Sequence, residues 1–176
     1  MKLLINIGHG GGDPGAVNQA LGVTENEYNK RLAAEIAKIA KVKVIEQDAR
    51  GLNKLVRDMN ALDPDLIVSL HCNAAATSSA TGTETLYWHT SKAGASLAAK
   101  VQANAVQALG LKDRGIKPRD NLAVLRGTKC PAIIVEPFFL SNAEDYAVAD
   151  SAIADLAKAI ITGVEAYVGC TYTSSW

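Results

Sequence analysis

The sequence lacks an excess of charge of either sign, because 18 lysines and arginines balance 18 aspartates and glutamates over 176 residues. A protein held on nucleic acid or on an anionic membrane by a general basic field carries a clear positive net charge. We therefore expect no nucleic-acid partner, and any polyanion that the chain meets must be recognised locally.

Paired cysteines are missing as well. Cys72, Cys130 and Cys170 are odd in number and form no C-x-x-C motif. This pattern argues against a disulfide framework and against a zinc site made of thiolates. Synthesis in a reducing compartment fits it best.

Long apolar runs are also missing. The first run, residues 2–7, stops at Gly8, too early for a signal peptide or a membrane span. We expect synthesis in the cytoplasm and no membrane insertion. With no repeat or linker, the chain is predicted to form one domain, residues 1–169, followed by a polar tail, residues 170–176.

Strand-like and helix-like segments alternate along the chain, which indicates a layered α/β domain. Thr24 and Glu27 form a capping-box pattern at the start of the first helix. Helical spacing of apolar residues predicts helices over residues 25–39, 52–59, 97–109 and 153–167. Short apolar or alternating runs predict strands over residues 2–7, 42–45, 66–71, 83–89, 121–125 and 132–135.

Ionisable side chains stand at the ends of three predicted strands. His9 follows the first strand, His71 ends "LIVSLH" and Glu136 ends "AIIVE". In open α/β sheets, ligands bind beyond the carboxyl ends of strands. Two imidazoles and one carboxylate make the open zinc site of many amide hydrolases, in which the metal activates a water molecule. A second carboxylate then transfers the proton to the leaving nitrogen, and Glu136 with either Glu25 or Glu27 is the natural pair.

Each candidate also has a structural interpretation. A histidine at a strand end serves equally as a hydrogen-bonded cap, and Glu25 as a favourable charge at a helix start. Glu84 is expected to face water on its strand, and His89 is expected at the surface. Glu136 follows four apolar residues, where an unpaired carboxylate is costly, so a partner such as a cation is expected.

The glycine-rich loop "GHGGGDPG", residues 8–15, is a poor match to a phosphate-binding loop. It has neither the G-x-G-x-x-G spacing opening into a helix nor a G-K-[ST] ending, and Asp13 would repel an anion. The loop is better suited to presenting His9 to a metal, because its glycines allow tight folding.

Six segments occur in order across nearly the whole chain: "GHGGGDPGA", "TENEYNKRLA", "RDMNALDPDLIVSLHCNAA", "GTETLYW", "RGIKPRDNLAVLR" and "CPAIIVEPFFLSNAED". Together they resemble the zinc-dependent N-acetylmuramoyl-L-alanine amidases of type 3. The resemblance implies a twisted mixed, mostly parallel sheet with helices on both faces, as in the phosphorylase/hydrolase-like fold.

The resemblance implies one Zn²⁺ per chain, with His9, Glu25 and His71 as its ligands, and Glu136 as the catalytic glutamate. Glu25 is chosen over Glu27 because the family's second ligand precedes an asparagine by four residues, and Asn29 has that spacing from Glu25 alone.

The implied reaction is hydrolysis of the amide between N-acetylmuramic acid and the L-alanine of the peptidoglycan stem peptide. Asn73 is a candidate substrate contact or, equally, a turn cap. Arg57 and Arg126 are candidates for holding an anionic stem peptide, or for structural pairing with a carboxylate.

The segment from His71 to Glu84 is a short loop, whereas many relatives carry a helical insertion there that blocks the zinc. We therefore expect an open site that needs no activator protein. A single catalytic domain without an evident leader favours a phage endolysin that reaches the cell wall during lysis, for instance through a holin. The alternatives are a bacterial wall-remodelling amidase, a zinc-dependent deacylase acting on another amide, and a non-catalytic wall-binding module.

Overall fold

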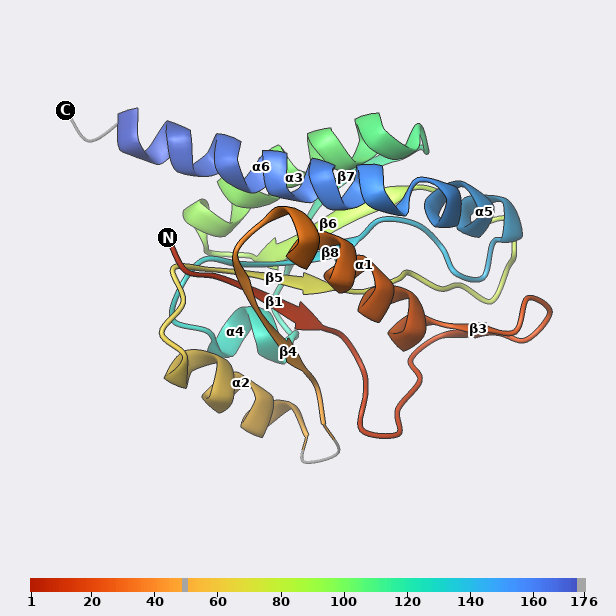
Figure 1. Cartoon of the computed structure of the whole chain (residues 1–176), viewed down its shortest axis with the longest axis horizontal. Coiled ribbons are helices and arrows are strands. Elements are labelled where there is room, and N and C mark those ends of the chain that lie inside the picture. The colour runs from red at the N-terminus through yellow and green to blue at the C-terminus, as the bar shows by residue number, and fades with distance from the viewer. Residues whose placement is uncertain (49–50, 174–176) are drawn as a thin grey trace.

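A computed structural model describes residues 1–48 and 51–173. Its main feature is a six-stranded sheet with the order β4-β1-β5-β8-β6-β7, and a two-stranded hairpin, β2-β3, stands apart from it (Figure 1). The strands are β1 (Leu3–Ile7), β2 (Val17–Asn18), β3 (Val23–Thr24), β4 (Val42–Glu46), β5 (Leu66–Leu70), β6 (Thr83–Trp88), β7 (Asp113–Arg119) and β8 (Ala132–Glu136).

The sheet is mixed and mostly parallel. Strands β4, β1, β5 and β8 run parallel to one another, while β6 pairs antiparallel with β8 and β7 pairs parallel with β6. The start of β6 therefore lies beside the end of β8. This places groups from β6 and β7 at the edge where β1, β5 and β8 end.

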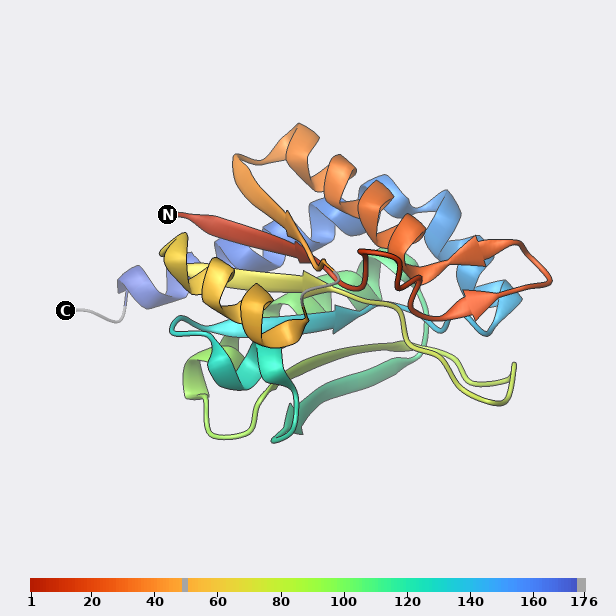
Figure 2. The same ribbon diagram turned by 90° about the horizontal axis from the view of Figure 1, so that it is seen from below.

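Helices cover both faces of the sheet, as predicted. One face carries α1, α3 and α6, and the other carries α2 and α4 (Figures 1 and 2). Alternate strand residues divide between two apolar clusters: Leu3 and Ile5 face the first set of helices, and Leu4 faces the second. The helices are α1 (Glu25–Ile39), α2 (Leu52–Ala61), α3 (Lys92–Leu109), α4 (Ala123–Gly127), α5 (Ala143–Ser151) and α6 (Ile153–Thr173).

Local signals set several helix ends where the sequence predicted them. The Thr24 side chain accepts the N–H of Glu27, and the Glu27 carboxylate accepts the N–H of Thr24, which completes the capping box of α1. Helix α3 ends at Gly110, whose φ of 63° lies in the left-handed region that glycine favours.

One predicted strand is wrong. Residues 121–125 do not form a strand; most of this segment forms the short helix α4, in which Val124 and Leu125 are buried. A five-residue apolar window does not distinguish the two periodicities. The sixth strand of the sheet is instead β7. The sequence does not predict it, because β7 is an edge strand whose residues are mostly polar and include Gly115 and Pro118.

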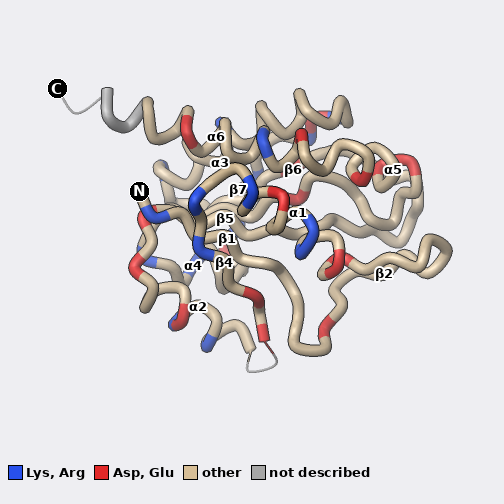
Figure 3. The backbone as a smooth tube through the Cα atoms, viewed as in Figure 1, with Lys and Arg blue, Asp and Glu red and all other residues tan. Residues whose placement is uncertain are grey.

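Helix α6 continues to Thr173, so the predicted tail, residues 170–176, begins inside this helix and its residues 174–176 lie outside the described part of the chain. Among the described residues, no helix combines the length and apolar character needed to cross a bilayer. Charges of both signs are interspersed along the backbone (Figure 3).

Candidate metal centre

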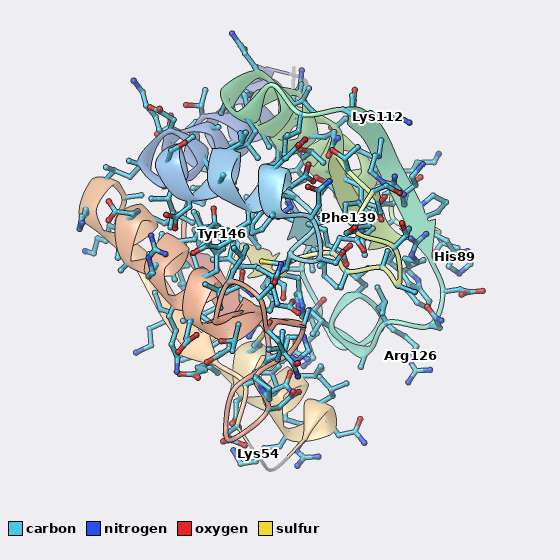
Figure 4. All side chains as sticks on the ribbon, turned by 90° about the vertical axis from the view of Figure 1, so that its right-hand side faces the viewer. Lys54, His89, Lys112, Arg126, Phe139 and Tyr146 are labelled. Atoms are coloured by element: carbon cyan, nitrogen blue, oxygen red, sulfur yellow. The ribbon has the colours of Figure 1, made fainter. Side chains whose placement is uncertain are left out.

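The predicted site residues meet at the carboxyl edge of the parallel strands. Ile7 pairs with Leu70, and Leu70 pairs with Val135, so β1, β5 and β8 end side by side. His71 and Glu136 directly follow paired residues and leave neighbouring strands at matching positions. Figure 4 looks onto this edge of the molecule.

His9 is presented by the glycine-rich loop after β1. Its own φ is +63°, an uncommon value for a residue with a side chain. A Cβ at Gly8 would lie 2.4 Å from Cε1 of His71, and one at Gly15 would lie 2.7 Å from Oε2 of Glu25. The glycines at these two positions therefore let the loop approach the other site residues closely.

Asp13 fixes the orientation of the His9 ring. Its Oδ2 lies 2.8 Å from His9 Nδ1, and its Oδ1 accepts the N–H of Gly15 at 3.0 Å. The hydrogen bond with His9 lowers the pKa of Asp13. A carboxylate on the outer imidazole nitrogen is the usual support of a metal-binding histidine, because it leaves Nε2 free to bind the metal.

Glu25 is the first residue of α1, only 3% exposed, and lies between the two histidines. Its Oε2 lies 3.3 Å from Nε2 of His9, and its Oε1 lies 3.0 Å from Nδ1 of His71. The backbone N–H groups of Ala16 and Cys72 also donate to the two carboxylate oxygens, each at 2.9 Å. The carboxylate is thus held in place from four directions.

Burial opposes ionisation of Glu25, but hydrogen bonds with His71 and then His9 outweigh it and lower its pKa below the ordinary range. The hydrogen bond with Glu25 has the opposite effect on His9, and raises its pKa to about 9. The Glu25 side chain is therefore ionised at neutral pH.

The donor set fits Zn²⁺. One potential ligand atom from each of His9, Glu25 and His71 lies within 4.8 Å of the others, and two imidazoles with one carboxylate match an open zinc site. Glu27, the alternative that the residues alone left open, is occupied elsewhere: its carboxylate accepts both the N–H and the hydroxyl of Thr24, at 3.2 and 2.8 Å.

Glu136 ends β8, and its carboxyl is partly buried. Burial raises its pKa to about 7, helped by the negative charges of Glu84 and Glu25 and opposed by Arg119 and Arg114. A carboxyl group with this pKa exchanges protons readily at neutral pH, which suits a general base that must later act as an acid.

The expectation for Glu84 is wrong. Its side chain does not face water: it is 5% exposed and accepts a hydrogen bond from Nε of Arg114 at 2.7 Å. Sequence reasoning also missed Arg114 and Arg119, because they lie on the unpredicted strand β7 and reach the site only through the pairing of β6 with β8.

The predicted substrate contacts are more scattered. Asn73 Oδ1 accepts the N–H of Ala74 at 2.9 Å, as a turn cap would. Arg57 on α2 and Arg126 on α4 are exposed, and within the described chain no contact joins either to the histidine–glutamate cluster; Figure 4 shows Arg126 pointing away from the body. His89 is exposed, as expected, with its ring 4.8 Å from that of Trp88.

A carboxylate between two imidazoles, with a further carboxyl on the adjacent strand, is the arrangement of a metal-assisted hydrolase. Residues 3–166 match the sequence profile of the family described as N-acetylmuramoyl-L-alanine amidase. The chain belongs to this family of hydrolases, as its sequence motifs predicted.

Three relatives illustrate the relationship. The N-acetylmuramoyl-L-alanine amidase LytC of Bacillus subtilis is 32% identical over 81% of this chain and 30% of its own length. The endolysin of Bacillus phage SPP1 is 31% identical over 91% of this chain and 63% of its own. The crystal structure of an N-acetylmuramoyl-L-alanine amidase from Clostridium difficile 630 superposes with a TM-score of 0.86 at 28% identity, covering 96% of both chains. The chain thus spans less than two thirds of these two sequence relatives.

Proposed function

We propose that this chain is a zinc-dependent amidase that hydrolyses the bond between the lactyl group of N-acetylmuramic acid and the L-alanine of the stem peptide. The observation that carries the proposal is the convergence of His9, Glu25 and His71 within 4.8 Å at the strand ends, with Glu136 leaving the neighbouring strand. Membership in the amidase family supports the choice of amide.

A bound Zn²⁺ would supply Lewis-acid activation of the attacking water and of the scissile carbonyl. Glu136 accepts the proton of that water and then donates it to the leaving nitrogen of L-alanine, because an amine departs readily only when protonated. Its pKa of about 7 allows both steps at neutral pH.

The remaining polar groups keep the site rigid. Asp13 orients His9, and the N–H groups of Ala16 and Cys72 orient Glu25. A site held in this way loses little orientational freedom when metal and substrate bind, which favours reaction. Asn73, Arg57 and Arg126 stay as proposed substrate contacts, with the turn-cap geometry of Asn73 favouring its structural interpretation.

We further propose that the purified chain acts on peptidoglycan without an activator protein. The segment between His71 and Thr83 contains no helix, so no element of the kind that blocks the zinc stands there. Purified chain and purified peptidoglycan alone should then suffice for hydrolysis. A need for an added protein would contradict this proposal.

The biological setting that we propose is a phage endolysin, made in the cytoplasm and released to the cell wall during lysis. Similarity to the SPP1 endolysin supports it, while the equal similarity to LytC favours the alternative of a bacterial wall-remodelling enzyme. Expression of the chain in a host with and without a holin tests this setting: we expect lysis only with the holin, and lysis without it would contradict the proposal.

The activity is tested by incubating the chain with purified peptidoglycan and analysing the products by mass spectrometry. We expect free stem peptides that begin with L-alanine, and their loss when a chelator is present. Release of a different amine would instead support a deacylase acting on another amide. A wall-binding module without catalysis predicts that Glu136→Ala changes nothing, whereas the proposed role requires loss of hydrolysis with zinc retained.

A further inference from the structure

A buried acidic pair lies beside the end of β8. Glu84, on β6, is the direct antiparallel partner of Glu136 on β8. Directly opposed side chains of neighbouring strands lie close together, and like charges at such positions repel. Glu84 is 5% exposed, so its charge requires a cationic partner.

Two arginines of β7 provide that partner. Arg114 donates from Nε to Glu84 at 2.7 Å, and Nη2 of Arg119 lies 3.8 Å from the other carboxylate oxygen of Glu84. Arg114 is also fixed by Phe139, whose ring centroid lies 4.8 Å beneath its guanidinium. Arg119 is held less tightly, because among the described residues its guanidinium donates a hydrogen bond only to the carbonyl of Pro118, the preceding residue.

We propose that Glu84 is a positioning residue that holds Arg114 and Arg119 away from Glu136, so that the general base keeps an unpaired carboxylate. This role rests on the proposed amidase function. A guanidinium forms strong, charge-assisted hydrogen bonds with a carboxylate, and a glutamate bound in this way is a poor proton acceptor. The arrangement therefore separates the cations of the site from its base.

The electrostatics of Glu136 agree with this geometry. Burial raises its pKa most, Glu84 and Glu25 raise it further, and Arg119 and Arg114 lower it. Removing the charge of Glu84 leaves both arginines without their carboxylate, and Arg119 is the one with freedom to turn toward Glu136.

Steady-state hydrolysis of a soluble muramyl peptide tests the role. In Glu84→Gln we expect kcat to fall by about tenfold, a part of what a general base contributes, while KM stays nearly constant. The double variant Glu84→Gln/Arg119→Gln should regain most of the lost kcat, because the competing cation is gone. Glu84→Asp, which keeps the carboxylate, should retain more activity than Glu84→Gln.

A matched control uses Lys112, which is exposed and points into solvent in Figure 4. Glu84→Gln/Lys112→Gln removes the same charge as the Arg119 double variant, and should not recover. A merely structural Glu84 would give no rescue by Arg119→Gln, and that result would overturn the proposal. A large rise in KM in Glu84→Gln, showing that the arginines bind substrate, would overturn it too.

A second measurement does not depend on activity. In metal-free protein, the NMR signal of the Arg119 Nε–H group should shift in Glu84→Gln, and it should move again in Glu84→Gln/Glu136→Gln, because the new carboxylate partner is gone. An Arg119 signal that ignores Glu136 would refute the pairing. If the wild-type chain released no stem peptide while the NMR result held, the amidase proposal would fail and the arrangement of these charges would stand.

Discussion

Glu136→Gln should make the metal-free protein more stable and inactive. The folded chain raises the pKa of Glu136 from its ordinary 4.5 to about 7, so the folded state binds this proton more tightly than the unfolded state does. The carboxyl therefore costs no stability below pH 4.5, and its cost grows as the pH rises to 7. Glutamine is neutral at every pH and escapes this cost.

The size of the effect follows from the pKa difference. At 1.36 kcal/mol for each pH unit, the difference between 4.5 and 7 gives a ceiling of about 3 kcal/mol above pH 7. The side chain is partly exposed, and solvent screening reduces the expected gain to about 1–2 kcal/mol. The variant and the wild type should be equally stable near pH 4.

Urea unfolding in the presence of a chelator, at pH 5 and pH 8, measures the free energy of unfolding. Glu165→Gln, on the exposed side of α6, controls for loss of one negative charge. The same Glu136→Gln protein, loaded with zinc, should hydrolyse peptidoglycan 10²–10⁴-fold more slowly, the usual contribution of a general base. A gain in stability that did not depend on pH would contradict the raised pKa of Glu136. Retained hydrolysis would contradict its role as the general base.

Three further predictions concern the ligands. His9→Ala and His71→Ala should each lose zinc, which elemental analysis detects; unchanged zinc content in both would contradict the ligand assignment. Asp13→Asn should weaken zinc affinity by about 10–100-fold by removing the support of the His9 ring, measured by competition with a chelator. Gly8→Ala should destabilise the fold by about 1–3 kcal/mol and disturb zinc binding, because its Cβ would lie 2.4 Å from the His71 ring; unchanged thermal unfolding would argue against this close approach.

The sequence predicted features that depend on neighbouring residues. The capping box at Thr24 and the glycine at position 110 are local signals, and the structure confirms the helix ends that they mark. The alternation of strands and helices was enough for the fold class, since parallel strands need crossover helices. The same alternation predicted that His9 and His71 lie at one edge of the sheet, and the structure places them together there.

Strand β7 could not be predicted from its own residues. Its charged, glycine- and proline-containing sequence is typical of a loop, and only its pairing with β6 makes it a strand. The opposite error occurs at residues 121–125, where a strand was predicted and most of the segment forms a helix. Burial of Val124 and Leu125 under the sheet is compatible with a single helical turn. In both segments tertiary contacts outweighed local preference.

The residue types of the site, and their positions at strand ends, were determined by the sequence itself. The tertiary structure decided which carboxylate joins the histidines, since Glu25 and Glu27 differ by two positions yet one enters the cluster and the other caps its helix. It also decided that Glu84 is buried beside Glu136 and paired with Arg114. The physical reason is that these partners are set by strand register and helix orientation, which join residues far apart in the chain.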